Sequence, residues 1–511
     1  VVADGHFDLG DANGDANVKS LTGGGTVDLG ANGLQLTDAH GDFGGVIGGE
    51  GGVNIVGGTQ TFSGCNTYSG ATVIDRGATL AIVGEGCIAG SDVVADGTLD
   101  IAGANGDIDV RSLAGGGDVD LGGNGLVLTA ANGDYAGTIR GDGGVTIENG
   151  TQSLSGENTF TGGLTLKGGT LQVSGDANLG TGTVSIGNGT LQTTGGFNSD
   201  NDFALTSPHA IVDTDGHDVT FNGDVSGNGT LNKVGEGTLT LKGENTQDGI
   251  NVKGGALEFA SDAALGRAGS VVTIADNTTL RPLDAMTISH EIFVDNTRWA
   301  VFDTNGFDVT MAGEISGSGI VQKLGGGVLT LSGRNTAVLM EVQGGSIAVT
   351  SQEAAGAVGG DIYIGTDGSF AALAGMNVTQ NVHVTGENAR FETRDGAQVT
   401  LTGNLDGSAC LIKSGAGRLD MRGGGSKAIG ACIEQGDLAF NSTFTGNVWV
   451  YADGTASGVG RVEGAMDVRG VLSPGNSPGA LVVTGDVLQH AGSTFVAGID
   501  RRTAGSGAGH F

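Results

Sequence analysis

Proline is scarce in this chain, which has 4 prolines but 103 glycines among its 511 residues. Disordered glycine-rich chains are usually also rich in proline and poor in β-branched residues. Here Val, Leu, Ile and Thr recur in short alternating runs between the glycines. The chain lacks a Gly-X-Y triplet period, which excludes a collagen helix. The composition therefore predicts a packed, repetitive β protein.

Basic residues and long apolar runs are also few. The 23 Lys and Arg residues stand against 56 Asp and Glu, a formal net charge of −33, so we expect no nucleic acid partner. Such a charge favours solubility. Alternatively, it indicates a surface that binds cations or that repels other copies of the same protein. No run of ~18 apolar residues predicts a membrane-spanning helix. The opening "VVADGHFDLG" lacks the pattern of a signal peptide, so we expect any export signal to have been removed.

The sequence repeats itself with a period of about 90 residues. Residues 93–129 match residues 1–37 at an offset of 92, and later copies begin near Val184, Val272 and Ile362. The repeats predict five units, 1–92, 93–183, 184–271, 272–361 and 362–447, followed by C-terminal coils at 448–511.

One motif within the units shows what each repeat builds. "KVGEGTLTLKGENT" (233–246) returns as "KLGGGVLTLSGRNT" (323–336) and "KSGAGRLDMRGGGS" (413–426). In such a segment Leu239 and Leu241 share one face at period two. Glycine, Asn and Asp clusters mark turns every four to eight residues, and no long amphipathic helix is visible. Short strands bury a face only when coils stack, so we predict an all-β solenoid, an elongated rod with coils of ~20–23 residues.

These repeats resemble the passenger-associated repeats of Gram-negative autotransporters. The similarity is carried by "GNGTLNKVGEGTLTLKGENTQDGINVKGGALEFASDAALG" (227–266) and "GENTFTGGLTLKGGTLQVSGDANLG" (156–180). Residues 460–495, with "PGNSPG" at Pro474–Gly479, look like the family segment that precedes the autochaperone region. The resemblance implies a right-handed parallel β-helix that is exported through the periplasm and an outer-membrane β-barrel and then displayed on the cell surface or secreted. The barrel itself is not part of this sequence, so we expect a passenger segment.

The four cysteines form two pairs with the same spacing. Cys65 and Cys87 are 22 residues apart, as are Cys410 and Cys432. One coil has about this length, so each pair is expected on adjacent coils, within reach of a disulfide. An exported protein would oxidise them. Free buried thiols and metal ligation are the alternatives, although no CxxC motif supports a metal.

Calcium is the only metal that the sequence suggests. Asp11, Asn13 and Asp15 place oxygen ligands at alternate positions, a pattern echoed at Asn105, Asp107 and Asp109. The glutamate that an EF-hand needs is missing, and turn-forming Asp and Asn explain the same residues. We therefore predict no cofactor and keep calcium as a weak candidate.

Catalytic signatures are weak. "DTDGHD" gathers Asp213, Asp215, His217 and Asp218, but its later copies lose His217 and then Asp213. No G-x-S-x-G elbow stands out, and His290 and Glu291 are not followed by an HExxH motif. No catalytic residue is predicted.

Two further groups of residues have a structural and a binding interpretation. Asn66, Asn158, Asn245 and Asn335 close the motif in four units, as turn residues with left-handed backbone or as a ladder of binding amides. Trp299, Trp449 and Tyr451 fit strand or core packing better than a sugar platform, although Trp449 and Tyr451 share a face.

The expected function is that of an adhesin. Rows of Thr, Ser, Asn and Asp along a β-helix would make many weak contacts, in cell–cell aggregation, biofilm formation or attachment to a host surface. The expected partners are other copies of the passenger or host surface molecules. A polysaccharide-active or other hydrolytic passenger, and a passive stalk for an upstream domain, are the alternatives.

Overall fold

A computed structural model describes the chain except for residues 276, 296–298, 425, 476–478 and 498–511. It divides into two compact units, Val1–Asn251 with Ala263–Arg267, and Val252–Asp262 with Ala268–Phe511. The described part of the chain is all strands and turns apart from three short 3-10 helices, η1 (Asp176–Asn178), η2 (Asp262–Leu265) and η3 (Glu353–Ala355). No helix in this part is long and apolar enough to cross a membrane. The predicted all-β class is confirmed.

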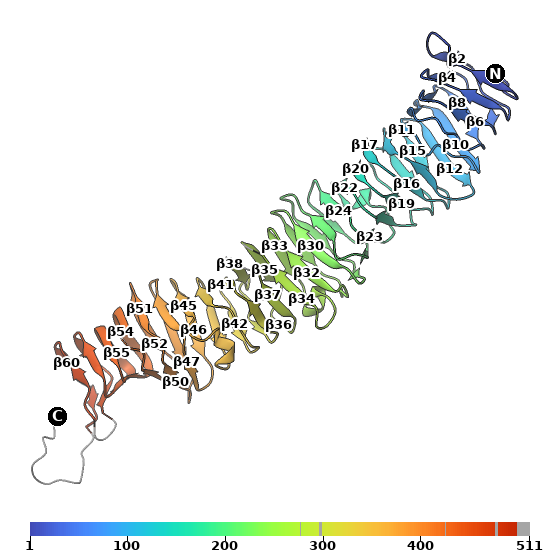
Figure 1. The fold of residues 1–511 in the computed structure, drawn as a ribbon. Helices are drawn as coiled ribbons and strands as arrows, with labels where there is room; N and C mark the ends of the chain where they lie inside the picture. Colours follow the sequence, from blue (N-terminus) through green and yellow to red (C-terminus); the bar gives the residue numbers. More distant parts are fainter. Residues whose placement is uncertain (276, 296–298, 425, 476–478, 498–511) are drawn as a thin grey trace, which may run out of the picture. The chain divides into compact units, whose positions relative to one another are not determined.

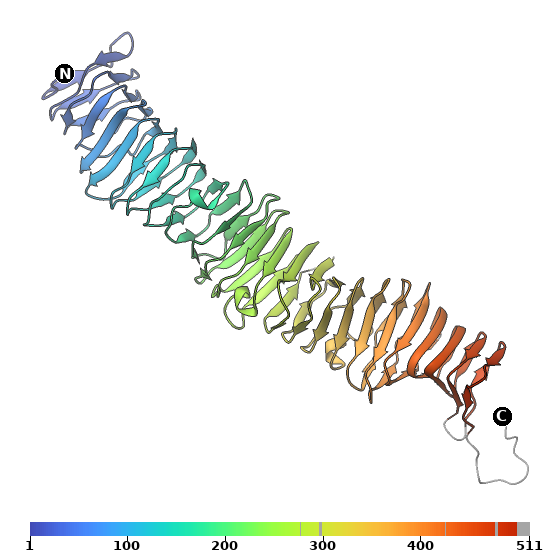
Figure 2. The same ribbon diagram turned by 180° about the vertical axis from the view of Figure 1, so that it is seen from behind.

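Parallel strands stack coil upon coil in the first unit. Figures 1 and 2 show this succession from opposite sides. Thr59 pairs with Thr79, Thr79 with Thr98, and Thr98 with Asp118, so one coil takes about 20 residues. This ladder consists of β8 (Gly58–Phe62), β10 (Ala78–Gly84), β12 (Thr98–Ala104), β15 (Asp118–Asp120) and β18 (Thr138–Arg140). The pairing confirms the predicted β-solenoid.

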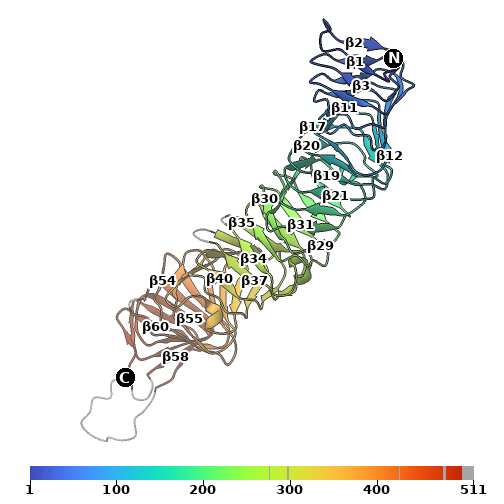
Figure 3. The same cartoon turned by 45° about the vertical axis from the view of Figure 1, so that its right-hand side comes forward.

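The same pairing begins the chain and continues in the second unit. β1 (His6–Asp8) and β3 (Thr26–Asp28) lie side by side near the N-terminus (Figure 3). In the second unit β45 (Asp361–Ile364), β48 (Asn381–Val384) and β51 (Leu405–Gly407) pair in order. The coils that follow are nearly continuous strand, as β54 (Ser426–Phe440) and β55 (Thr443–Gly458).

The core is a continuous inner column of apolar side chains. Leu126, Val145, Leu164, Val184 and Phe203 are register partners on successive coils, and all are buried. Between the buried positions of the later strands lie the partly exposed residues Thr146, Thr165, Ser185 and Ala204, as period two requires, whereas Val127 in the first strand is also buried. Their strands are β16 (Leu126–Leu128), β19 (Val145–Ile147), β21 (Leu164–Leu166), β23 (Val184–Ile186) and β26 (Phe203–Leu205). Stacking therefore buries what one short strand leaves exposed.

The glycines of the repeated motif are required where coils touch backbone to backbone. A Cβ at Gly237 would lie 1.8 Å from the carbonyl oxygen of His217, and one at Gly327 equally close to that of Phe307. No side chain fits at such a distance, so glycine recurs at this point of the motif. The two compact units are a coarser division than the five sequence units, whose boundaries stay a prediction.

Candidate functional sites

Three lysines open the copies of the repeated motif and lie inside the coils. Lys233, Lys323 and Lys413 are completely buried, and no carboxylate of the described residues lies within ion-pair distance of them. The ammonium group of Lys323 donates to the carbonyl oxygens of Leu324 at 2.7 Å and Gly325 at 2.8 Å. Burial lowers the pKa of each lysine to about 8. The lysines thus fasten the turn that follows them, a role that sequence reasoning missed although their 90-residue recurrence signalled it.

All four motif asparagines are buried, and three of them join neighbouring coils. Asn245 accepts a hydrogen bond from Val225 N at 2.7 Å and donates to Ala264 O at 2.7 Å, so it joins the coils before and after its own. Asn158 and Asn66 make corresponding bonds, whereas Asn335 bonds locally to Ala337. All four are buried, and none has a left-handed backbone. The turn-conformation explanation was therefore wrong.

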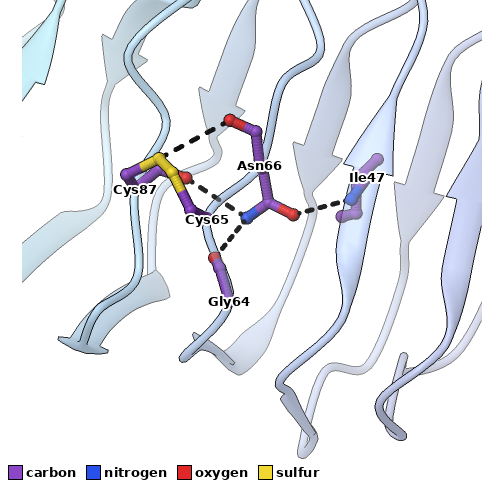
Figure 4. The surroundings of a disulfide bond; sticks show 5 residues. All are labelled: Ile47, Gly64, Cys65, Asn66 and Cys87. Carbon is purple, nitrogen blue, oxygen red and sulfur yellow. Dashed lines mark hydrogen bonds between the residues drawn. A yellow bond between two sulfur atoms is a disulfide. The ribbon is translucent and has the colours of Figure 1, made fainter.

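Cys65 and Cys87 lie directly opposite each other on adjacent coils and form a disulfide (Figure 4). Asn66 beside them donates to Cys87 O at 3.3 Å and to Gly64 O at 3.2 Å. Its Oδ1 accepts from the backbone nitrogen of Ile47 at 2.9 Å. The bond thus adds a covalent link to coils that the Asn66 amide already joins.

Cys410 and Cys432 also lie together, with their sulfurs 2.6 Å apart and no S–S bond drawn between them, so the expected disulfide stays a prediction. The register differs between the two cysteine pairs. Cys410 lies opposite Gly430, and Cys432 lies opposite Ile412, so the two cysteines are diagonal neighbours.

The calcium candidates do not converge. Asp11, Asn13 and Asp15 are all exposed, and Asp15 accepts a hydrogen bond from Gly33 N at 2.6 Å. No group of three or more His, Cys, Asp or Glu side chains suited to a metal occurs in the described part of the chain. Asp107 repeats the bond of Asp15 by accepting from Gly125 N. These acids thus serve the turns between coils, and calcium binding stays an untested prediction.

The acidic group in "DTDGHD" is likewise occupied with turns. Asp213 accepts a hydrogen bond from Asp215 N at 3.0 Å, and Asp215 has a left-handed backbone with a φ of 45°. Asp218 accepts from Thr238 N on the next coil at 3.0 Å. In the described part of the chain, no side-chain hydrogen bond joins His217 to these acids. The group does not form an acid–base pair.

Ser289, Asp262 and His290 form a cluster in the second unit, but they are not arranged as a hydrolase triad. Ser289 and His290 both bond to the carboxylate of Asp262, with His290 Nδ1 at 2.8 Å from Asp262 Oδ1. Burial alone would raise the pKa of Asp262, but these bonds outweigh it and lower the pKa. In a triad the histidine stands between serine and carboxylate. Here Asp262 stands between them, at the start of η2, and Glu291 accepts instead from Ser316.

The outward faces of the first unit carry polar side chains in register, which we call the outer rows. One row is Thr59, Thr79 and Thr98. A second is Thr146, Thr165 and Ser185. A third contains Gln172 and Gln192, whose amides are joined by a 2.8 Å hydrogen bond that continues to Asp213. These rows hold hydroxyl and amide groups at the inter-strand spacing of ~4.8 Å.

A charged row crosses three coils of the second unit. His383 contacts Asp361 Oδ1 through Nε2 at 3.0 Å and Asp406 Oδ1 through Nδ1 at 2.6 Å. Tyr363 stacks on the imidazole with ring centroids 4.4 Å apart. Burial alone would lower the pKa of His383, but the two carboxylates raise it above its usual value. The His383 ring therefore links neighbouring coils.

Trp449 and Tyr451 point outward from β55, contrary to the expected core packing. Trp449 is half-buried with its ring across Gly430, and Tyr451 is 42% exposed. Trp449 lines an open groove of about 640 Å³ with Met466 and Leu488. Tyr451 lines another, of about 520 Å³. Trp299 begins β38 (Trp299–Asp303) and is half-buried. The middle of "PGNSPG" lies outside the described residues.

Comparison with known proteins finds one repeat family and two relatives. The passenger-associated-transport-repeat matches residues 57–82, 148–173, 231–259 and 321–347. An adhesin, the BmaC autotransporter of Brucella suis biovar 1 (strain 1330), is 29% identical over 286 residues, which are 55% of this chain and 8% of that protein. An extracellular serine protease of Serratia marcescens is 33% identical over 93 residues, 18% of this chain and 9% of that protein. No solved structure matches the chain.

The chain therefore spans less than a tenth of the length of either curated relative. The matched repeats include the segments that carry Lys233 and Lys323, which donate hydrogen bonds to the turns that follow them. Four passenger-associated-transport repeats on a parallel β-solenoid, together with an adhesin among the relatives, support an autotransporter passenger that is adhesin-like in sequence.

Proposed function

We propose that the chain is the adhesive part of a surface-displayed passenger and that it binds through the outer rows rather than through a deep pocket. The observation that supports this most is the register of polar side chains across successive coils. Thr146, Thr165 and Ser185 repeat one chemistry along the solenoid, so many weak contacts would add through multivalency. The adhesin relative supports the same interpretation.

The partner in this proposal is a second passenger on a neighbouring cell. Hydroxyl and amide rows are self-complementary because each group both donates and accepts hydrogen bonds. The similarity to autotransporter passengers supports export to the cell surface or secretion. We propose the usual route through the periplasm and an outer-membrane barrel.

Enzymatic activity has weaker support. The serine protease relative shares 93 residues with this chain, and the Ser289–Asp262–His290 cluster is not arranged for attack by the serine hydroxyl. A passive stalk is distinguished from an adhesin by testing this segment without any upstream domain.

The experiment displays residues 1–511 on bacteria that do not aggregate and follows settling of the culture. We expect clumping. Thr146→Glu with Thr165→Glu would place carboxylates in one row, and we expect clumping to fall at least fivefold. Thr59→Glu with Thr79→Glu is the matched control in another row. If only one of the two double variants loses clumping, the row that it changes is the adhesive face. Absence of clumping in the unaltered chain would refute self-association and favour a host surface molecule.

A further inference from the structure

Trp449 and Tyr451 form an aromatic patch on the outer face of the second unit. Both side chains leave β55 on the same side, because they are two residues apart on one strand whose neighbouring positions are buried. The Trp449 ring lies across Gly430 of the preceding coil, where a Cβ would clash with it. The indole therefore lies along the surface, half-buried, instead of standing away from it. A large ring held in this way at an outward position indicates a binding surface.

The open groove beside Trp449 combines this ring with polar groups. The groove has a volume of about 640 Å³ and crosses three coils, on which Trp449, Asp467 and Leu488 are register partners. Asn447 and Asp486 also line it. Within the described residues, the amide nitrogen of Asn447 and the carboxylate of Asp486 bond to no other protein group. The groove thus offers a hydrogen-bond donor and an acceptor beside an apolar ring, as ligand sites do.

The charges around the patch decide which class of ligand fits. The Asp486 carboxylate and the net charge of −33 disfavour a polyanion. A lipid tail or an apolar protein surface would bury that carboxylate without a partner, which is strongly unfavourable. A cation is held best where several aromatic rings surround it, whereas Trp449 and Tyr451 line different grooves. A neutral sugar chain fits, because its apolar ring faces stack on an indole while its hydroxyls bond to carboxylates and amides.

We propose that this patch binds a neutral oligosaccharide, with Trp449 as the stacking platform and with Asn447 and Asp486 as partners of the sugar hydroxyls. Successive coils are ~4.8 Å apart, which is close to the length of one sugar unit in an extended chain. A linear oligosaccharide that lies across the coils therefore places one ring over Trp449 and the next near Asp467. The site is separate from the outer rows of the first unit and adds a second kind of contact to the chain.

Tryptophan fluorescence gives a direct test, because the chain has only 2 tryptophans. The full chain with Trp299→Phe keeps Trp449 as its single tryptophan. Its emission is followed while neutral hexasaccharides of glucose, galactose, mannose or N-acetylglucosamine are added. We expect a saturable blue shift with at least one of these sugars, because stacking removes water from the indole. The shift should be the same from ~0.05 to ~0.5 M salt, since the ligand carries no charge to be screened.

Calorimetric titration of further variants with the same sugar tests the roles of single residues. Trp449→Ala should weaken binding at least tenfold, and Trp449→Phe, which keeps a ring, should weaken it less. Asp486→Ala should weaken binding several-fold, whereas Asp486→Asn keeps an acceptor for hydroxyls and should change it less than threefold. Thr146→Glu with Thr165→Glu, in the outer rows, is the matched control and should leave binding unchanged. Circular dichroism checks that each variant keeps its β structure.

No fluorescence shift with any of the sugars would overturn the proposal, and so would equal affinity of Trp449→Ala and the unaltered chain. Hexalysine serves as a cationic probe. A shift with hexalysine but with none of the sugars, lost in Asp486→Asn and at high salt, would show a cation site instead. Clumping of displaying cells is a separate outcome, because it tests the outer rows of the first unit.

Discussion

At the scale of single residues, the least expected feature of the repeat is the burial of three lysine side chains without a carboxylate partner. A lysine ammonium is rarely buried without a carboxylate, because desolvation costs several kcal/mol unless its donors are satisfied. Lys413 satisfies them with the carbonyl oxygens of Ser414, Gly415 and Gln435. The motif thus uses a cation to collect carbonyl groups that a tight turn leaves without partners.

Replacing Lys323 by methionine should destabilise the second unit by roughly 3 kcal/mol, because the carbonyl groups of Leu324 and Gly325 lose their donor inside the coil. Urea titration followed by circular dichroism measures the change. Lys167→Met, at an exposed position, is the control and should change stability by less than about 0.5 kcal/mol. Equal effects would contradict the bracing role.

The same variant tests the direction of the pH dependence. The pKa of Lys323 is lowered to about 8 from 10.5, so between these values the unfolded chain binds more protons than the folded one. Stability from this site therefore rises with pH across that window, by at most about 1.4 kcal/mol per pH unit. The stability difference between the wild type and Lys323→Met should be larger at pH 9.5 than at pH 7. A difference that shrinks would show that the sign is wrong.

At the scale of elements, glycine fixes how closely one coil approaches the next. Gly327 lies against the backbone of Phe307, whereas its neighbour Gly326 has open space around the position of a Cβ. Neither has the positive φ that L side chains avoid. The two positions therefore separate close packing from backbone flexibility.

Gly327→Ala should cost roughly 2–3 kcal/mol because its methyl group would force the coils apart. Gly326→Ala is the matched control, and it should be neutral or slightly stabilising because alanine restricts the unfolded chain. Thermal melting of both variants beside the wild type measures the contrast. Similar melting temperatures for both variants would refute the close-approach explanation.

The His383 row gives a second pH test, with the opposite sign. The carboxylates of Asp361 and Asp406 raise the pKa of His383 above 6.5. The stability that this row contributes is therefore complete below pH 6.5 and is lost as pH rises through the folded pKa. The melting temperature of His383→Gln should approach that of the wild type between pH 5.5 and 8.5. His209→Gln, at an exposed position, should show no such trend.

Sequence patterns predicted the elements better than the contacts. Period two placed Leu239 and Leu241 inside correctly, because alternation alone decides which face a strand buries. It missed Lys233, because burial of an ammonium depends on carbonyl groups that only the folded turn brings together. The 22-residue spacing correctly placed Cys410 and Cys432 on adjacent coils. It did not predict that they lie diagonally, because spacing along the chain does not give the register of two paired strands. Trp449 lies opposite Cys432 and faced outward against expectation, with its ring across Gly430, where a Cβ would clash with it.

At the scale of the whole molecule, charge governs whether two passengers meet. The net charge is −33, and residues 1–251 contain 31 acidic and 7 basic residues. Two such surfaces repel each other at low salt. The Debye length falls from ~30 Å at 0.01 M to ~8 Å at physiological strength, so screening removes most of the repulsion at distances where the outer rows have not yet touched.

Clumping of displaying cells should therefore be weak at 0.01 M salt and stronger near 0.15 M. Settling assays across this range, with calcium or with a chelator, measure the effect. Further clumping with calcium would indicate that Asp-rich turns bridge two chains. Clumping that is strongest at the lowest salt would contradict an approach limited by repulsion and would favour attraction between opposite charges.

Each coil pairs with the coil before it and the coil after it, at an offset of about 20 residues. Pairing of this kind does not set a fixed number of coils. Duplicating a unit in the gene adds binding rows without disturbing the packing of the others, and losing one removes rows in the same proportion. Selection on adhesion can thus act through copy number, which changes avidity in steps, while the individual contacts stay the same.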